Sequence, residues 1–145
     1  MRLAMRICPE QQDRWQRKAL ALMTRLNAID QIELLLALQQ YEQAIDVAID
    51  QFEDLKGCYY NHLLRVLEQS PETCGLLKVV IYRCLLLDVL DRAYTKAYTY
   101  GARYLKALSV LDAEINDYQK LDTHSEFEVY LNERHGRKRS FWALL

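Results

Sequence analysis

The sequence predicts an all-α protein with about seven or eight antiparallel helices in a single domain that covers residues 1–145. Three observations lead to this prediction. The 145 residues include only four Gly and two Pro, so few helix breakers interrupt the chain. Hydrophobic residues make up 51% and charged residues 27%, a balance typical of globular proteins. Apolar residues also recur at spacings of three and four, which is the period of an amphipathic helix.

The first half of the chain divides into four predicted helices. Pro9 suits the first turn of a helix, Asp30 is a good N-cap, and Gly57 is a plausible C-cap. Between these signals the apolar residues keep to one face of each segment. The predicted helices cover residues 9–27, 31–38, 41–57 and 59–69.

The second half begins at a clear boundary, Ser70-Pro71, which we interpret as an N-cap followed by a first-turn proline. The helix predicted from there to residue 90 is apolar nearly all round, so it should be central and packed on both sides. Thr123 and Glu126 form the pattern of a capping box. The remaining predicted helices cover residues 91–111, 114–121 and 123–135, and Gly136 interrupts the helical pattern after the last of them.

Two segments share the pattern Tyr-x-x-Ala-x-x-x-small, one from Tyr41 to Ala48 and the other from Tyr94 to Gly101. Ala93, Ala97 and Gly101 would then form a seam of small residues along one helix. Each segment follows a leucine-rich helix, so each would be the second helix of a hairpin that buries its face on the next unit. This pattern resembles tetratricopeptide-type repeats. The resemblance implies a short α-α superhelix, although the offset between the two segments differs from the usual repeat period.

A second resemblance covers roughly residues 15–145. The order of features is similar to the helical C-terminal region of bacterial SWIM-type zinc-finger proteins. It comprises the Ala44 helix, the Ser70 boundary, the Tyr94 helix and an ending that runs from Phe127 to Phe141. The resemblance implies an interaction scaffold beside a DNA-binding or metal-binding module, and it suggests a fragment or a truncated relative. The zinc-finger ligands themselves have no match in this chain.

Charge, cysteine content and hydropathy exclude several classes of protein. The net charge of −1 provides no global field to attract nucleic acid or an anionic membrane. Apolar runs such as residues 34–38 are too short to span a bilayer, so we expect no membrane association. The four cysteines form no CxxC pair and lie within helical patterns. We therefore expect reduced thiols and a cytoplasmic location.

No motif indicates an enzyme, a metal site or a cofactor. The phosphate-binding glycine patterns are missing, and three histidines without a defined nucleophile turn do not suggest catalysis. Cys58 and His62 are four residues apart and could form half of a zinc site on one helix face, but no second pair completes it. A buried cysteine beside a partly exposed histidine is the better interpretation.

Two groups of residues are candidates for binding a protein or peptide. Tyr94, Tyr98, Tyr100 and Tyr104 would form two stripes on one helix, and tyrosine provides rigid contact area with a polar tip. Alternatively, one stripe belongs to the core and the other packs on the next hairpin. Asp46 and Asp50 belong to an acidic ridge that could receive a basic segment, although such ridges are usually only solvated.

The C-terminal segment 134–145 combines cations with aromatic residues. Arg134, Arg137, Lys138 and Arg139 could contact phosphate or an acidic partner, with Phe141 and Trp142 stacking on bases. The favoured interpretation is that the aromatic residues cap the core while the cations remain solvated.

Taken together, these patterns predict a non-catalytic scaffold that binds a protein or peptide on a tyrosine-lined face. One alternative is an accessory nucleic-acid-associated domain that uses the basic segment, and another is self-assembly into a homo-oligomer.

Overall fold

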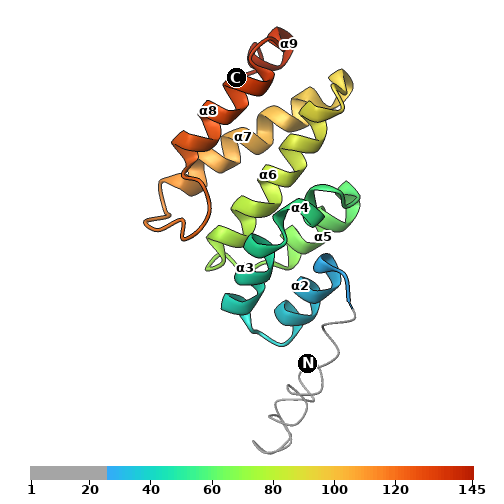
Figure 1. Cartoon of the computed structure of the whole chain (residues 1–145), viewed down its shortest axis with the longest axis vertical. Coiled ribbons are helices and arrows are strands. Elements are labelled where there is room, and N and C mark those ends of the chain that lie inside the picture. Colours follow the sequence, from blue (N-terminus) through green and yellow to red (C-terminus); the bar gives the residue numbers. More distant parts are fainter. Residues whose placement is uncertain (1–25) are drawn as a thin grey trace, which may run out of the picture.

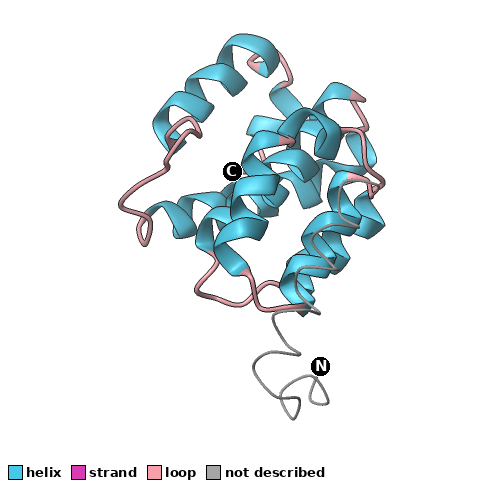
Figure 2. Cartoon of the chain, turned by 60° about the horizontal axis from the view of Figure 1, so that its bottom comes forward, coloured by secondary structure: helices cyan, strands magenta, loops and turns pink. Residues whose placement is uncertain are grey.

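The computed structural model describes residues 26–145, and the first predicted helix lies mostly outside this range. The described residues form eight α-helices and one 3-10 helix, with no strand among them (Figures 1 and 2). The all-α prediction is therefore confirmed, as is the expected number of helices. The α-helices are α2 (Ala28–Ala37), α3 (Tyr41–Asp50), α4 (Phe52–Lys56), α5 (Tyr60–Gln69), α6 (Gly75–Asp91), α7 (Tyr98–Asp112), α8 (His124–His135) and α9 (Arg139–Trp142).

α6 is the central element of the fold. Figure 1 shows it running through the middle of the molecule, and it packs against α3, α4, α5 and α7. Its apolar side chains divide between two core clusters. Leu77, Ile81 and Leu85 join the cluster built with α2 to α5, whereas Leu86 and Leu90 join the cluster built with α7 to α9. The prediction of a central helix that is apolar on all sides is therefore confirmed.

Several predicted boundaries in the first half were wrong. The N-cap of α2 is Asn27, whose side chain accepts a hydrogen bond from the Asp30 amide at 2.9 Å, so Asp30 lies in the first turn. Gln51 divides the segment predicted as one helix over 41–57 into α3 and α4. The C-cap predicted at Gly57 is confirmed, and it ends α4.

The predicted helix start at Ser70 was also wrong. Ser70 is the C-cap of α5, and its hydroxyl donates a hydrogen bond to the Val66 carbonyl at 2.7 Å. Ser70 is extended because it precedes Pro71, so α5 ends there. α6 begins only at Gly75, after a turn.

The segment predicted as one helix over 91–111 contains a sharp turn. α6 ends at Asp91, and Ala93 has a φ of 51°, a left-handed conformation that a helix cannot include. The 3-10 helix η2 (Thr95–Ala97) follows, and α7 runs antiparallel to α6 (Figure 1). The small-residue seam predicted on one helix is therefore broken. Gly101 alone makes the close approach, since a Cβ there would lie 3.1 Å from Phe141.

The C-terminal helices close the second core cluster. The capping box at the start of α8 is confirmed, because Thr123 and Glu126 exchange hydrogen bonds of 3.1 and 3.2 Å. The helix predicted over 114–121 does not form, and a loop joins α7 to α8. Phe141 of α9 is fully buried against α7.

Candidate functional site

Four tyrosines from three helices lie close together, and we call this surface the tyrosine face. It consists of Tyr60 on α5, Tyr82 on α6, and Tyr100 and Tyr104 on α7. The rings of Tyr82 and Tyr104 lie 6.0 Å apart. Burial raises the pKa of Tyr104, and electrostatic interactions with Tyr100, Tyr82 and Tyr60 raise it further.

The tyrosine face has a fixed base and an accessible rim. Tyr82 and Tyr104 are half-buried and pack against both core clusters. Tyr60 and Tyr100 are 53% and 55% exposed, and the Arg103 guanidinium lies 5.7 Å from the centre of the Tyr100 ring. The rim therefore presents tyrosine and arginine side chains, the residue types most enriched in the centres of protein interfaces.

The structure separates the four tyrosines predicted to form two stripes. Tyr98 is 4% exposed and packs edge-on against the Phe141 ring at 5.7 Å, so its assignment to a binding surface is corrected to the core. Tyr94 lies in the turn before η2 rather than on the helix, because the chain reverses at Ala93. The structure therefore keeps Tyr100 and Tyr104 together and adds Tyr60 and Tyr82, which sequence spacing could not associate with them.

The acidic ridge is exposed and largely unpaired within its own helix. Asp46 and Asp50 are both exposed on α3. The Asp50 carboxylate lies 3.9 Å from the Lys120 ammonium of the α7–α8 loop, with both side chains mostly in solvent. A surface pair of this kind contributes little to stability.

In the C-terminal segment the aromatic residues pack against the core, whereas most of the basic residues are exposed. Phe141 is buried, and the half-buried Trp142 donates its indole N–H to the His135 carbonyl at 3.0 Å, so both aromatic residues pack on the second core cluster. The Arg134 guanidinium lies 3.5 Å from the Asp91 carboxylate, and Lys138 is half-buried. Arg137 and Arg139 remain exposed.

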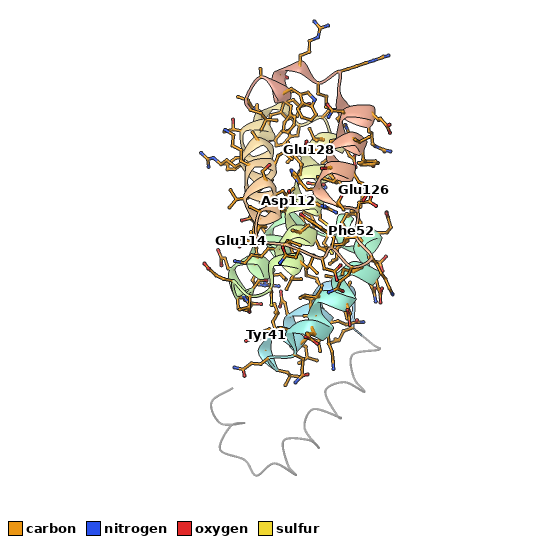
Figure 3. All side chains as sticks on the ribbon, turned by 90° about the vertical axis from the view of Figure 1, so that its left-hand side faces the viewer. Tyr41, Phe52, Asp112, Glu114, Glu126 and Glu128 are labelled. Carbon is orange, nitrogen blue, oxygen red and sulfur yellow. The ribbon has the colours of Figure 1, made fainter. Side chains whose placement is uncertain are left out.

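A pocket of about 490 Å³ is lined by residues that include Phe52, which is labelled in Figure 3. Its apolar lining comes from α3, α4, α6, α8 and the α7–α8 loop. This volume is within the range of small-molecule sites, about 300–1,000 Å³. The apolar residues of the lining are Ile49, Phe52, Leu87, Leu121, Phe127 and Tyr130.

Arg83 of α6 is the buried charge of this pocket. It is 3% exposed, and its Nε and Nη2 atoms have no hydrogen-bond partner in the described part of the chain. The guanidinium carbon lies 4.6 Å from the centre of the Phe127 ring and 5.5 Å from that of Tyr118. Burial lowers the pKa of Arg83, and electrostatic interactions with Tyr118, Asp122, Asp112 and Glu126 oppose that effect.

Sequence reasoning missed Arg83, although a signal was present. Beyond its first turn, the helix predicted to be apolar on every side contains three charged residues, Lys78, Arg83 and Asp88. Helical spacing alone does not show which of the three lies inward, because neighbours cover every side of this helix. A charged residue within such a helix is therefore a candidate for a buried functional group.

Cys58 and His62 do not form a half site. Cys58 precedes α5 and its thiol donates to the Asp54 carbonyl at 3.6 Å, whereas His62 is exposed on the helix. No group of three or more His, Cys, Asp or Glu side chains in residues 26–145 is placed to hold a metal ion. Within the same residues, no helix is both long and apolar enough to cross a bilayer.

These features define an all-helical protein with an aromatic face and a separate charged pocket. The chain belongs to DUF6880, a family of unknown function, whose sequence profile matches residues 10–144. No curated protein and no solved structure matches the chain. The resemblances to tetratricopeptide repeats and to SWIM-type proteins therefore remain predictions.

Proposed function

We propose that this chain is a non-catalytic protein–protein interaction module of the cytoplasm, which binds its partner on the tyrosine face. The observation that carries the proposal is the gathering of four tyrosines from α5, α6 and α7, two of them more than half exposed. Tyrosine buries a large area at a low entropy cost, because its ring has few rotatable bonds. A partner segment would therefore gain apolar contact from the rings and hydrogen bonds from their hydroxyl groups.

The base of this face is suited to binding without rearrangement. Tyr82 and Tyr104 are held by both core clusters, so their rings are already ordered before a partner arrives. Ordering side chains on binding reduces affinity, and a pre-organised surface avoids much of that cost. Arg103 beside Tyr100 adds a positive charge, which favours a partner with acidic residues near its apolar contacts.

The test is a pull-down from source-cell lysate with the full chain as bait, treated with nuclease and quantified by mass spectrometry. The key variant is Tyr60→Ser/Tyr100→Ser, since both side chains are exposed and neither supports the core. Val129→Ser is the matched control, because Val129 is 56% exposed on α8. We expect at least one protein whose recovery falls about tenfold with the tyrosine variant and is unchanged with the control.

The alternatives predict different outcomes of the same experiment. A nucleic-acid-associated domain would lose its partners on nuclease treatment and with an Arg137→Glu/Arg139→Glu variant, because phosphate contacts depend on those cations. A self-assembling domain would recover only copies of itself. Equal recovery of every protein by wild type and by the tyrosine variant would contradict the proposal.

A further inference from the structure

Arg83 carries a buried positive charge that would destabilise the fold unless a partner neutralised it. Burying a charge strongly destabilises a protein unless the charge is paired, and proteins rarely tolerate an unpaired one. Nevertheless Arg83 forms no ion pair or hydrogen bond with any described residue. Its guanidinium lies over the rings of Phe127 and Tyr118. A cation–π contact offsets part of this cost, but it leaves the N–H donors unused.

The charges around the pocket leave Arg83 as the unpaired cation. At the rim, Lys120 lies 3.9 Å from Asp50, and Lys56 lies 3.5 Å from Glu53. Each of these two lysines is therefore paired with a carboxylate, so the four residues together contribute no net charge. The remaining charged residues of the lining are Arg83 and the exposed Asp122, which lie too far apart for an ion pair.

Two further carboxylates near Arg83 are already engaged. Asp112 accepts a hydrogen bond from the Tyr118 hydroxyl at 2.6 Å, and burial together with this bond raises the pKa of Tyr118 to about 12. Glu126 is held by the capping box with Thr123. Both carboxylates make the electrostatic potential around Arg83 more negative, but neither accepts a hydrogen bond from its guanidinium N–H groups.

We propose that this pocket binds a monocarboxylate carried on an apolar or aromatic body, with Arg83 as the group that recognises the carboxylate. Guanidinium N–H groups match the two oxygens of a carboxylate, and such charge-assisted hydrogen bonds are among the strongest in proteins. Phe52, Leu87 and Phe127 would contact the body of the ligand. Because Asp112, Asp122 and Glu126 already lie near Arg83, a singly charged group fits better than a phosphate dianion.

The site is distinct from the tyrosine face and does not depend on the proposed function. The carboxylate could come from a free small molecule or from the C-terminus of a peptide. Two acid and amide pairs separate these sources: 3-phenylpropionate with 3-phenylpropanamide, and N-acetyl-glycyl-phenylalanine with its C-terminal amide. In each pair only the charge and the acceptor oxygen change.

The experiment is a titration of the full chain followed by NMR, with the backbone amides and the Arg83 Nε–H resonance as reporters. We expect at least one acid to shift the Arg83 signal together with amides of α4 and α8, and to bind about tenfold more tightly than its amide. A response to phenylpropionate alone indicates a small-molecule site, whereas a response to the peptide acid alone indicates a terminal-carboxylate site.

Three variants make the assignment to Arg83 specific. Arg83→Met should bind the acid no better than the amide, and Arg83→Lys should weaken acid binding because an ammonium lacks the guanidinium fork. Asp122→Asn removes a nearby negative charge from an exposed position, so it should tighten acid binding severalfold. If either Arg83 variant fails to fold, the wild-type acid and amide comparison and the Asp122 variant still decide the question.

The proposal is overturned by any of three results. These are equal affinity for acid and amide, shifts that map outside the pocket, or weaker acid binding by Asp122→Asn. Absence of binding by both acids at millimolar concentration would overturn it as well.

Discussion

At the scale of single residues, the buried side chain of His135 near the end of α8 is held close to a carboxylate and two cations. It is 4% exposed, and its Nε2 atom lies 3.1 Å from the Asp91 carboxylate, although the two are poorly aligned for a hydrogen bond. Lys138 and Arg134 add positive charge nearby. Burial is the main cause that lowers the pKa of His135 from its ordinary value of 6.5, the cations lower it further, and Asp91 opposes them. The native fold therefore favours the neutral ring.

This lowered pKa predicts a loss of stability in mild acid. The unfolded chain takes up a proton at His135 near pH 6.5, whereas the folded chain takes it up only at lower pH. The unfolded state binds more protons in that interval, so the free energy of unfolding falls as the pH falls below about 6.5. Chemical denaturation of wild type and His135→Gln at several pH values between about 7.5 and 5 should show a shallower slope for the variant.

His62→Gln is the control for this measurement, since His62 is exposed on α5. Its stability should vary with pH as that of wild type does. The assignment to His135 is wrong if the two histidine variants have the same pH dependence.

At the scale of helices, side-chain caps decide where α8 begins but not where α6 begins. The Thr123 hydroxyl accepts a hydrogen bond from the Glu126 amide, and the Glu126 carboxylate accepts one from the Thr123 amide. These bonds lower the pKa of Glu126. Ser70 also carries a hydroxyl group and is followed by a proline, yet its hydroxyl donates a hydrogen bond to the preceding helix. A serine can therefore satisfy either neighbouring helix, and the sequence pattern alone does not distinguish the two.

The cap at Thr123 predicts a moderate loss of stability on substitution. Thr123→Ala removes the acceptor for an otherwise unsatisfied amide at the start of α8, and it should destabilise the fold by about 1 kcal/mol. Urea denaturation followed by circular dichroism would measure the change.

Ser125→Ala is the matched control in the same turn, because Ser125 is exposed. It should change the free energy of unfolding by less than about 0.5 kcal/mol. Equal effects of the two variants would mean that the capping hydrogen bonds contribute nothing to stability.

At the scale of the whole molecule, α6 joins two core clusters into one folded unit. The first cluster is closed by α2 to α5 and the second by α7 to α9. Phe141 completes the second cluster, with edge contacts to Tyr98 at 5.7 Å and Trp142 at 5.2 Å. Because both clusters use α6, loss of either one exposes the central helix, so the fold should unfold as a single unit.

Removal of the Phe141 ring tests this arrangement. Phe141→Ala should lower the free energy of unfolding by about 3–5 kcal/mol, because the side chain is fully buried and leaves a cavity. Leu144→Ala, three residues later, removes a side chain that is 42% exposed, and it should cost less than about 1 kcal/mol. A Phe141 variant as stable as wild type would show that α9 is not part of the cooperative core.

The sequence by itself determined the helical class, the central position of the apolar helix, the capping box at Thr123 and the burial of Phe141. Each of these depends on residues close together in the chain, or on a helix so apolar that every side must be covered. Helical period and cap chemistry are local properties, and a single sequence displays them directly.

Only the tertiary structure decided the breaks at Gln51 and Ala93, the burial of Tyr98, the grouping of Tyr60 with Tyr100, and the pocket around Arg83. The spacing of Tyr98 and Tyr100 does not show which ring meets Phe141, because that contact joins residues about forty positions apart. The burial of Arg83 likewise depends on α8 and the α7–α8 loop, which lie next to it only in the folded chain. Surfaces assembled from distant segments follow from packing, and packing has no local signature in the sequence.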